Sequence, residues 1–471
     1  MRPAMSAPFP LSQQTWYDQR DDRTRRVDGV GGFESFRLAV VVSEDAEYYY
    51  STQLATYITL NILARWCRKI SITLPKEASS LLPSTHGQEL KAVLESMMER
   101  IDPFGEFRFL AAGEKGEGRC LRIGRQSDTV HDDDIGMDSG GWTGGVWRGS
   151  CPSWTSGGKD DINPIGPALA SSIGVAEVFR EAVGLGMGDK IPQWYSLYDF
   201  QCTEEPVELN NPTLPPDTEV GHVLQVGCGA VGSALDALLA TTPWTGTITL
   251  IDGDRVDPTN CNRSLSFEAY DCAPPKEKVA ACARVLEGSG IKPLPYGKRF
   301  DDFVQTGLYL NPAPDVVLCL ANEDNVWSAI QNNLPPVALH ATTTPSWGTN
   351  LGRHIPKKDW CLLCRFRREL KHVFTPRCSE GEIGFAPETG QPVEGVLPFL
   401  SPLSATILLS EIAKLLDSHQ GRPENFVSFS TRNRHGRFVS LRREPEPDCL
   451  CRDQTLELYP TQVKSSRFWI T

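Results

Sequence analysis

Residues 223–240 read VLQVGCGAVGSALDALLA, and this stretch decides the fold of the chain. Gly227, Gly229 and Gly232 form the pattern GxGxxG between an apolar predicted strand and a predicted helix. The first glycine allows a tight turn, the second lets a phosphate approach the backbone, and the third lets the helix pack on the strand. The stretch therefore predicts a Rossmann-type nucleotide loop.

The next predicted strand ends in a group of polar residues, LIDGDRVDPTNCNR at 250–263. Asp252 closes this strand, where its carboxylate is placed to accept hydrogen bonds from ribose hydroxyls. Up to this point NAD and ATP are equally good ligands. Arg263 and Lys276 separate them, because an arginine and a lysine together can hold a triphosphate and neutralise charge that develops on it. Hydride transfer has no such need.

A third predicted strand, DVVLCLANEDN at 315–325, ends in Asp324 before a predicted helix. A carboxylate at the carboxyl end of a strand suits Mg²⁺ beside phosphates. The polar residues at these strand ends therefore predict a site for a nucleoside triphosphate and its magnesium ion.

Together, the glycine loop, the pattern D-x-D-x-V-x3-N-x2-R, a Pro-Lys and a strand ending in Asp-Asn resemble the adenylating family that includes MoeB, ThiF and the ubiquitin-activating enzymes. The resemblance covers about residues 220–455. It implies a set of ATP-binding and Mg²⁺-binding residues, namely Gly227, Gly229, Gly232, Asp252, Asp254, Asn260, Arg263, Lys276, Asp324 and Asn325. Two positions stay open, since Asn322 is an alternative to Asp324 and Lys278 to Lys276.

The resemblance also implies a reaction. The C-terminal carboxylate of a protein attacks the α-phosphorus of ATP, giving an acyl-adenylate and pyrophosphate. The enzyme mainly positions the reactants and neutralises charge. Arg263 and Lys276 are therefore expected to be catalytic.

Four of the fourteen cysteines form two close pairs. Cys361 and Cys364 lie in WCLLC, and Cys449 and Cys451 lie in PDCLC near the chain end. Two such pairs fit a tetrahedral zinc site with four thiolate ligands. Family members with a structural zinc place their pairs in the same regions. We expect the zinc to clip the C-terminal segment to its domain without taking part in catalysis.

Cys378 lies in the polar segment FTPRCSEGEIGF at 374–385. Arg377 adjoins it, and positive neighbours favour the thiolate, which is the reactive form of cysteine. In thioester-forming relatives, a cysteine in this crossover region attacks the adenylate. The resemblance therefore implies that Cys378 is the catalytic nucleophile.

The first half of the chain has a β-α-β-α-β pattern from Phe36 onward, which predicts a doubly wound sheet. Its first turn, SEDAEYYYS at 43–51, has no glycine and cannot bring backbone N–H groups close around a phosphate. The late segments NPIGPALASSIGVAEVFREA and PFLSPLSATILLSEIAKLL resemble each other. The chain is therefore expected to contain two copies of one architecture, the first degenerate and the second ATP-binding.

The expected fold class is α/β, with two Rossmann-like doubly wound adenylation-type domains. The expected boundaries are a polar N-terminal segment at 1–35, an inactive domain at 36–202, a proline-rich linker at 203–221 and an active domain at 222–471, which carries the crossover loop and the zinc site. Ubiquitin-activating enzymes pair an active with an inactive adenylation domain, so the layout resembles a compact bacterial-type activating enzyme.

In this family an arginine from an N-terminal helix crosses to the ATP of the partner domain. The segment WYDQRDDRTRR at 16–26 resembles that helix. Arg20 or Arg23 is therefore expected to reach the phosphates of the second domain. Because both halves lie in one chain, the expected unit is an internal pseudo-dimer, and a homodimer is also compatible with the sequence.

The formal charge of −12 argues against a nucleic-acid binder. The N-terminus has no apolar signal region and the chain no membrane-length apolar run, so we expect a cytoplasmic protein without a membrane partner. The resemblance implies two partners, a ubiquitin-like protein with a C-terminal glycine and a conjugating enzyme. One alternative is a sulfur-carrier adenylyltransferase of the MoeB or ThiF kind, which the degenerate first half disfavours. Another is a non-catalytic ATP-binding scaffold, which the full set of polar residues disfavours.

Overall fold

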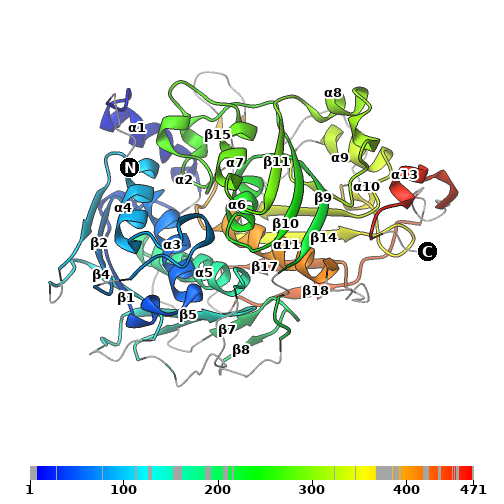
Figure 1. The fold of residues 1–471 in the computed structure, drawn as a ribbon. Helices are drawn as coiled ribbons and strands as arrows, with labels where there is room; N and C mark the ends of the chain where they lie inside the picture. The colour runs from blue at the N-terminus through cyan, green and yellow to red at the C-terminus, as the bar shows by residue number, and fades with distance from the viewer. Residues whose placement is uncertain are drawn as a thin grey trace.

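The protein is built from two halves with the same strand order, as the computed structural model shows (Figure 1). The structure describes residues 8–27, 29–76, 78–111, 114–125, 130–150, 152, 162–185, 193–204, 211–214, 217–322, 324–344, 346–366, 384–385, 392–393, 395–416, 424–432, 436–447, 449, 451 and 456–468. The first sheet has the order β3-β2-β1-β4-β5-β6-β7-β8, and the second has the order β11-β10-β9-β12-β13-β14-β17-β18. Counted within each half, the two orders are identical. The expected two-domain α/β fold is therefore confirmed.

The first sheet is parallel from β3 to β5 and antiparallel from β5 to β8. Its strands are β1 (Arg37–Val42), β2 (Lys69–Thr73), β3 (Glu106–Phe109), β4 (Arg119–Ile123), β5 (Ile135–Gly140), β6 (Thr143–Arg148), β7 (Gln193–Ser196) and β8 (Cys202–Thr203). The helices of this half are α1 (Gln13–Arg20), α2 (Asp22–Arg25), α3 (Tyr50–Ala64), α4 (Leu90–Ile101) and α5 (Ile165–Ala182).

The second sheet repeats the same change from parallel to antiparallel pairing after its fifth strand. Its strands are β9 (Glu219–Val226), β10 (Thr245–Ile251), β11 (Ile291–Tyr296), β12 (Val316–Cys319), β13 (Ala338–Thr344), β14 (Gly348–His354), β17 (Phe426–Ser430) and β18 (Val439–Leu441). The helices of this half are α6 (Ala230–Leu239), α7 (Lys278–Leu286), α8 (Phe300–Gln305), α9 (Asp324–Asn332), α10 (Leu362–Phe366), α11 (Leu400–Leu416) and α13 (Thr461–Lys464), with a short ribbon of β15 (Gly384–Phe385) and β16 (Pro392–Val393).

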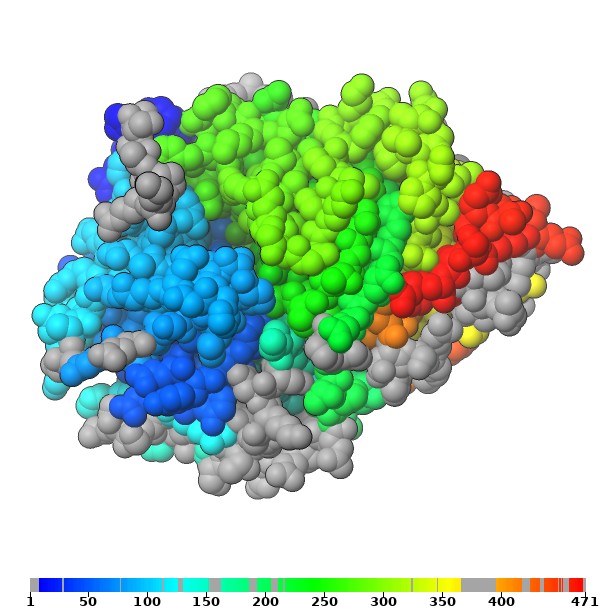
Figure 2. All heavy atoms as spheres, viewed as in Figure 1, coloured from blue at the N-terminus to red at the C-terminus, as the bar shows by residue number. Residues whose placement is uncertain are grey.

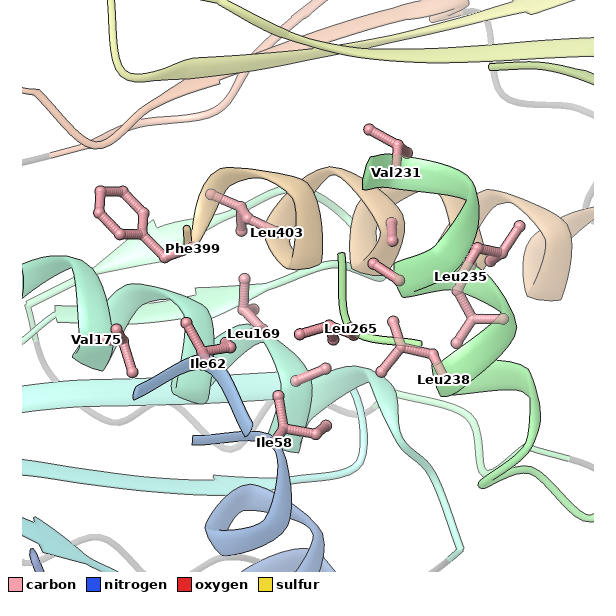
Figure 3. Close-up of a cluster of buried hydrophobic side chains, with 14 of the residues drawn as sticks. Ile58, Ile62, Leu169, Val175, Val231, Leu235, Leu238, Leu265, Phe399 and Leu403 are labelled. Atoms are coloured by element: carbon pink, nitrogen blue, oxygen red, sulfur yellow. The ribbon is translucent and has the colours of Figure 1, made fainter. Parts of the chain in front are cut away.

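The two halves share a core made by their long helices. Helix α3 packs on α5 in the first half, α6 packs on α11 in the second, and α5 packs on α11 across the boundary. Ile58, Leu169, Leu235 and Leu403 come from these four helices and point into one buried apolar cluster (Figure 3). On the face drawn in Figure 2, the blue and cyan first half adjoins the green second half along a continuous boundary. Because the core is shared, the halves form one packed body.

Two expected boundaries differ from the structure. The N-terminal segment is more than a polar extension, because Trp16 and Tyr17 of α1 are buried among apolar side chains. Strand β9 begins at Glu219, within the expected linker. None of the helices in the described ranges is long and apolar enough to span a membrane.

Candidate nucleotide-binding site and metal centre

The glycine loop joins β9 to α6 at the carboxyl edge of the second sheet. Gly227 has a φ of 107°, and a Cβ there would collide with the backbone of Leu320 and Ala321. Gly229 caps α6, and no atom lies within 4 Å of the position that its Cβ would take. A Cβ on Gly232 would meet the backbone of Gly227. The loop thus leaves open space at the N-terminus of a helix, where a phosphate is favoured.

Asp252 lies directly after β10 and is tied to the glycine loop. Its Oδ2 accepts a hydrogen bond from the Cys228 backbone N–H at 2.8 Å, and its Oδ1 accepts one from the Asp254 N–H at 2.9 Å. Burial raises the pKa of the Asp252 carboxyl above its ordinary value, and the charge of Lys278 opposes this shift. The carboxylate therefore stands beside the phosphate loop, as a ribose-binding group must.

Of the two lysines left open by the sequence, the structure brings Lys278 to this carboxylate group. Lys278 begins α7, and its Nζ lies 2.7 Å from Asp254 Oδ2. The Nζ of Lys276 instead lies 2.9 Å from Oδ1 of Asp271, a buried carboxylate that also binds Arg284. Lys276 is therefore paired with Asp271 and Lys278 with Asp254, and a phosphate contact of either lysine stays a prediction.

Asn260 and Arg263 lie in the loop that follows β10. The 3-10 turn η4 (Pro258–Asn260) begins at Asp257, whose N–H donates to Asn260 Oδ1 at 3.1 Å. Arg263 is buried, and its Nη1 donates to the carbonyl of Thr259 and, at 2.7 Å, to Asn262 Oδ1. Both side chains are thus held by the backbone and side chains of their own loop.

The magnesium position stays a prediction. Helix α9 begins at Asp324, just after β12, which agrees with the expected placement at a strand end. Asn322 lies between the same strand and helix and is exposed, and so is Asn325. The choice between Asp324 and Asn322 is not decided by this placement.

The two candidate N-terminal arginines have different surroundings. Arg20 has no exposed surface, and its guanidinium lies 2.6 Å from Asp102 and 2.7 Å from Asp21. The expectation that Arg20 reaches phosphate does not fit this buried ion pair. Arg23 lies on α2, which contacts the second half through a 2.9 Å hydrogen bond from Asn262 to Thr24. A phosphate contact of Arg23 stays a prediction.

The four cysteines of the two pairs come together as expected. Their ligand atoms lie within 4.8 Å of one another, and the Sγ atoms of Cys361 and Cys364 are 3.7 Å apart. Cys449 lies 3.5 Å from Cys361, and Cys451 lies 3.5 Å from Cys364. Zn–S bonds of about 2.3 Å in tetrahedral geometry separate the sulfurs by about 3.8 Å. The donor set therefore fits a tetrahedral metal centre, and its assignment to zinc stays a prediction.

Cys378 lies outside the described residues, so its expected role as nucleophile is untested by the structure. The described residues that flank it in sequence are Phe366, which ends α10, and Gly384, which begins β15.

A buried polar cluster that was not predicted from the sequence lies behind the glycine loop. Asp236 of α6 has no exposed surface, and Gln225 donates a hydrogen bond to its Oδ2 at 3.1 Å. Cys228 and Cys282 place their Sγ atoms within 4.8 Å of this carboxylate. Burial raises the pKa of Asp236 to about 7. The sequence signal that could have predicted this cluster is the aspartate inside the apolar run SALDALLA.

The raised pKa of Asp236 makes the free energy of unfolding depend on pH. The substitution Asp236→Asn is expected to remove this dependence. Between an ordinary carboxyl pKa near 4 and the folded value of about 7, only the folded state keeps the proton. Stability contributed by this group is therefore lost as pH rises toward 7. We expect Asp236→Asn to gain about 2–3 kcal/mol relative to the wild type between pH 5 and pH 8. Urea unfolding of both proteins at each pH measures this, and a difference that stays constant with pH contradicts it.

A doubly wound sheet with an open glycine loop, a carboxylate at the end of the next strand and a lysine at a helix start is the arrangement of a nucleotide-binding domain. Residues 218–451 match the ThiF family, and residues 37–187 match the family described as the BilD N-terminal domain. The second half of the chain is therefore a ThiF-family domain, in the adenylating family that contains MoeB and the ubiquitin-activating enzymes. Membership in this family implies the use of ATP and Mg²⁺.

Individual relatives cover less of the chain. The chain is 37% identical over 82 residues to the NEDD8-activating enzyme E1 catalytic subunit of Arabidopsis thaliana, which is 17% of this chain and 18% of that protein. It is 24% identical over 214 residues to isethionate sulfite-lyase of Nitratidesulfovibrio vulgaris, covering 41% of this chain and 24% of that protein. The chain thus spans a quarter or less of these curated relatives.

Among solved structures, E. coli MccB with MccA aligns with 49% of this chain and 66% of its own. The sequence identity is 19% and the TM-score is 0.37. A likeness at this level carries no argument about function, so the family assignment rests on the sequence match of the second half.

Proposed function

We propose that the protein activates the C-terminal carboxylate of a ubiquitin-like protein with ATP and then holds that protein as a thioester on Cys378, for transfer to a conjugating enzyme. The observation that carries this proposal is the asymmetry between two halves with one strand order. Only the second half has the open glycine loop. The same position in the first half is the turn η2 (Glu44–Glu47), whose three acidic side chains repel phosphate.

One active and one inactive half in a single chain favour this activity over its nearest alternative. Sulfur-carrier adenylyltransferases of the MoeB and ThiF kind are paired copies of one active domain. A chain that has kept a second, degenerate half resembles the paired domains of ubiquitin-activating enzymes instead. The partial similarity to a NEDD8-activating enzyme supports the same choice.

In the proposed first step, a carboxylate oxygen of the substrate forms a bond to the α-phosphorus of ATP. The bond between that phosphorus and the bridging oxygen breaks, and pyrophosphate leaves. The residues of this chain bind and orient the nucleotide, with Asp252 on the ribose. Lys278 and Arg263 neutralise charge that develops on the phosphates.

In the proposed second step, the thiolate of Cys378 attacks the acyl carbon of the adenylate. A thioester bond forms, the bond from the acyl carbon to the phosphate oxygen breaks, and AMP leaves. The step needs no oxidant or reductant. The four-cysteine centre would take no part, because its four sulfurs would be the ligands of the metal that this donor set fits.

A non-reducing gel tests both steps. The full-length protein is incubated with Mg-ATP and a glycine-terminated ubiquitin-like protein from the same organism. We expect an adduct that requires ATP, is cleaved by added thiol and is absent with the Cys378→Ala variant. Cys120→Ala, which changes a half-buried cysteine of the first half, serves as the matched control and is expected to keep the adduct.

The outcomes separate the alternatives. An adduct that survives in Cys378→Ala moves the thioester to another cysteine. Pyrophosphate exchange without an adduct indicates an adenylate-only enzyme of the MoeB kind. If the partner binds the protein but gives neither an adduct nor pyrophosphate exchange, the proposed activity is contradicted and the scaffold alternative is favoured.

A further inference from the structure

We infer that the inactive first half is a working part of the active site, because its residue Arg65 holds the phosphate-contacting loop of the second half in shape. The loop consists of residues 257–268 and carries Asn260 and Arg263. Its role with phosphate rests on the proposed function, whereas the contacts that hold it are described by the structure.

Arg65 follows the last residue of α3 and reaches across the boundary between the halves. It has no exposed surface. Its Nη1 donates to the carbonyl oxygens of Cys261 at 2.8 Å and Phe267 at 3.1 Å, and its Nη2 donates to that of Leu265 at 2.8 Å. One buried cation thus gathers three carbonyls of a single loop.

The three acceptors enclose the functional residue of the loop. Arg263 lies between Cys261 and Leu265 in the chain, so fixing these two carbonyls fixes the backbone on both sides of it. The loop has no regular sheet or long helix to define its shape. Without the guanidinium, three buried carbonyls would lose their partner, which costs enough to favour another loop conformation.

The cation is itself supported only by neutral oxygens among the hydrogen bonds that the structure describes for it. Its Nε donates to Asn61 Oδ1 at 3.0 Å, and the remaining bonds go to the loop. Burial lowers the pKa of Arg65 to about 10, which still leaves it charged at neutral pH. Burying a charge costs much less free energy when its donors are hydrogen-bonded than when they are left without partners. Arg65 and the loop therefore depend on each other.

Other residues of the first half hold the same loop. Thr24 accepts a hydrogen bond from Asn262 at 2.9 Å, and Arg100 lies 2.9 Å from Glu268. The side chain of Leu265 points into the apolar cluster between the halves (Figure 3). The loop is therefore attached to the first half along its length.

The equivalent position of the second half offers no such clamp to the first half among the residues that the structure describes. In α3, the residue after the last helical position is Arg65, whereas in α6 the same position is Ala240. Alanine has no side chain that could reach the corresponding loop of the first half. This asymmetry matches the presence of a glycine loop in the second half only, and it gives the degenerate half a reason to be retained.

The test compares two buried arginines that cross between the halves. Arg65→Met removes the clamp. Arg180→Met is the matched control, because Arg180 is also buried and donates to the carbonyls of Thr431 and Arg432, away from the loop. Both full-length variants are titrated with Mg-ATP by calorimetry, and hydrogen exchange of residues 257–268 is followed without nucleotide. We expect Arg65→Met to weaken ATP binding at least about tenfold and to speed exchange in the loop.

Arg180→Met is expected to leave both measurements near the wild-type values, although it also lowers the unfolding temperature. If Arg65→Met keeps wild-type ATP affinity and loop protection, the inference is wrong. If the wild type itself binds no ATP, the proposed function fails and the loop exchange still tests the clamp. Should Arg65→Met not fold, Arg65→Lys replaces it. A lysine there can satisfy only part of the carbonyl set, so intermediate ATP affinity and exchange are expected, and wild-type values for both overturn the inference.

Discussion

We expect Lys278→Ala to lower ATP–pyrophosphate exchange about 100-fold or more, and Lys276→Ala to leave it within about twofold. The two lysines are two residues apart, so the pair is a matched comparison. The Lys278 side chain is 13% exposed and lies beside Asp254, next to the carboxylate that closes β10. Removing it takes away a fixed cation at the site where phosphate charge develops.

Lys276 is expected to matter little because its partner keeps another cation. Its side chain is 48% exposed, and Asp271 retains its hydrogen bonds from Arg284 when the lysine is lost. Exchange is measured with the ubiquitin-like protein as acceptor, and thermal unfolding shows that both variants are folded. Equal losses in both variants, or a larger loss in Lys276→Ala, would contradict the assignment of Lys278.

Removing the metal from the four-cysteine centre is expected to unfold the C-terminal segment of the second half. The centre joins α10 to the two cysteines near the chain end, Cys449 and Cys451. Structural zinc contributes about 10 kcal/mol or more to the folding of small zinc domains. We therefore expect Cys361→Ser with Cys364→Ser, or treatment with a strong chelator, to lower the unfolding temperature by about 10 °C or more.

The control for this double variant is Cys202→Ser, which changes a half-buried cysteine of the first half. It should keep its metal and its unfolding temperature. Elemental analysis of the purified wild type supplies the second measurement, with one zinc per chain as the expected result. A wild type that contains no zinc and melts unchanged after chelation would overturn the assignment of the metal.

Local sequence was enough for the parts of the site that depend on local backbone geometry. The three glycines predict the loop because a turn, a close approach and a helix contact each exclude a Cβ at a known spacing. The placement of Asp252 beside the glycine loop is predicted by its position at the end of an apolar strand. The spacing of the two cysteine pairs predicts that their sulfurs lie together, because four cysteines in two close pairs are typical of a tetrahedral metal site.

Tertiary contacts decided which cation is available. The N-terminal segment has several arginines, and its sequence predicts that Arg20 can contact phosphate. In the fold, Arg20 instead forms a buried ion pair with Asp102, which is distant in the chain. Lys276 and Lys278 are two residues apart in sequence, and their different partners in the fold, Asp271 and Asp254, separate them. Which partner a long charged side chain takes depends on groups that are far apart in the chain, and a single sequence does not encode those neighbours locally.

The glycine-rich stretch at 135–148 shows the same limit in a strand. Its glycine content predicts no regular element, whereas the stretch forms β5 and β6. Gly136 lies opposite Trp147 and Gly145 lies opposite Trp194, and each indole occupies the space of the missing Cβ. Glycine is a poor strand former alone, and cross-strand packing makes it the fitting residue here.

By itself, the sequence determined the α/β class, the repeat of two halves, the Rossmann-type glycine loop and the meeting of the four cysteines, because each follows from short-range pattern and the chemistry of residue types. Only the tertiary structure shows that Lys278 pairs with Asp254 while Lys276 pairs with Asp271. It alone shows that Arg20 is buried in an ion pair with Asp102, and that Arg65 of the first half donates to three carbonyls of the loop at 257–268. Those outcomes depend on hydrogen bonds and ion pairs between residues that are distant in the chain and meet only in the folded protein.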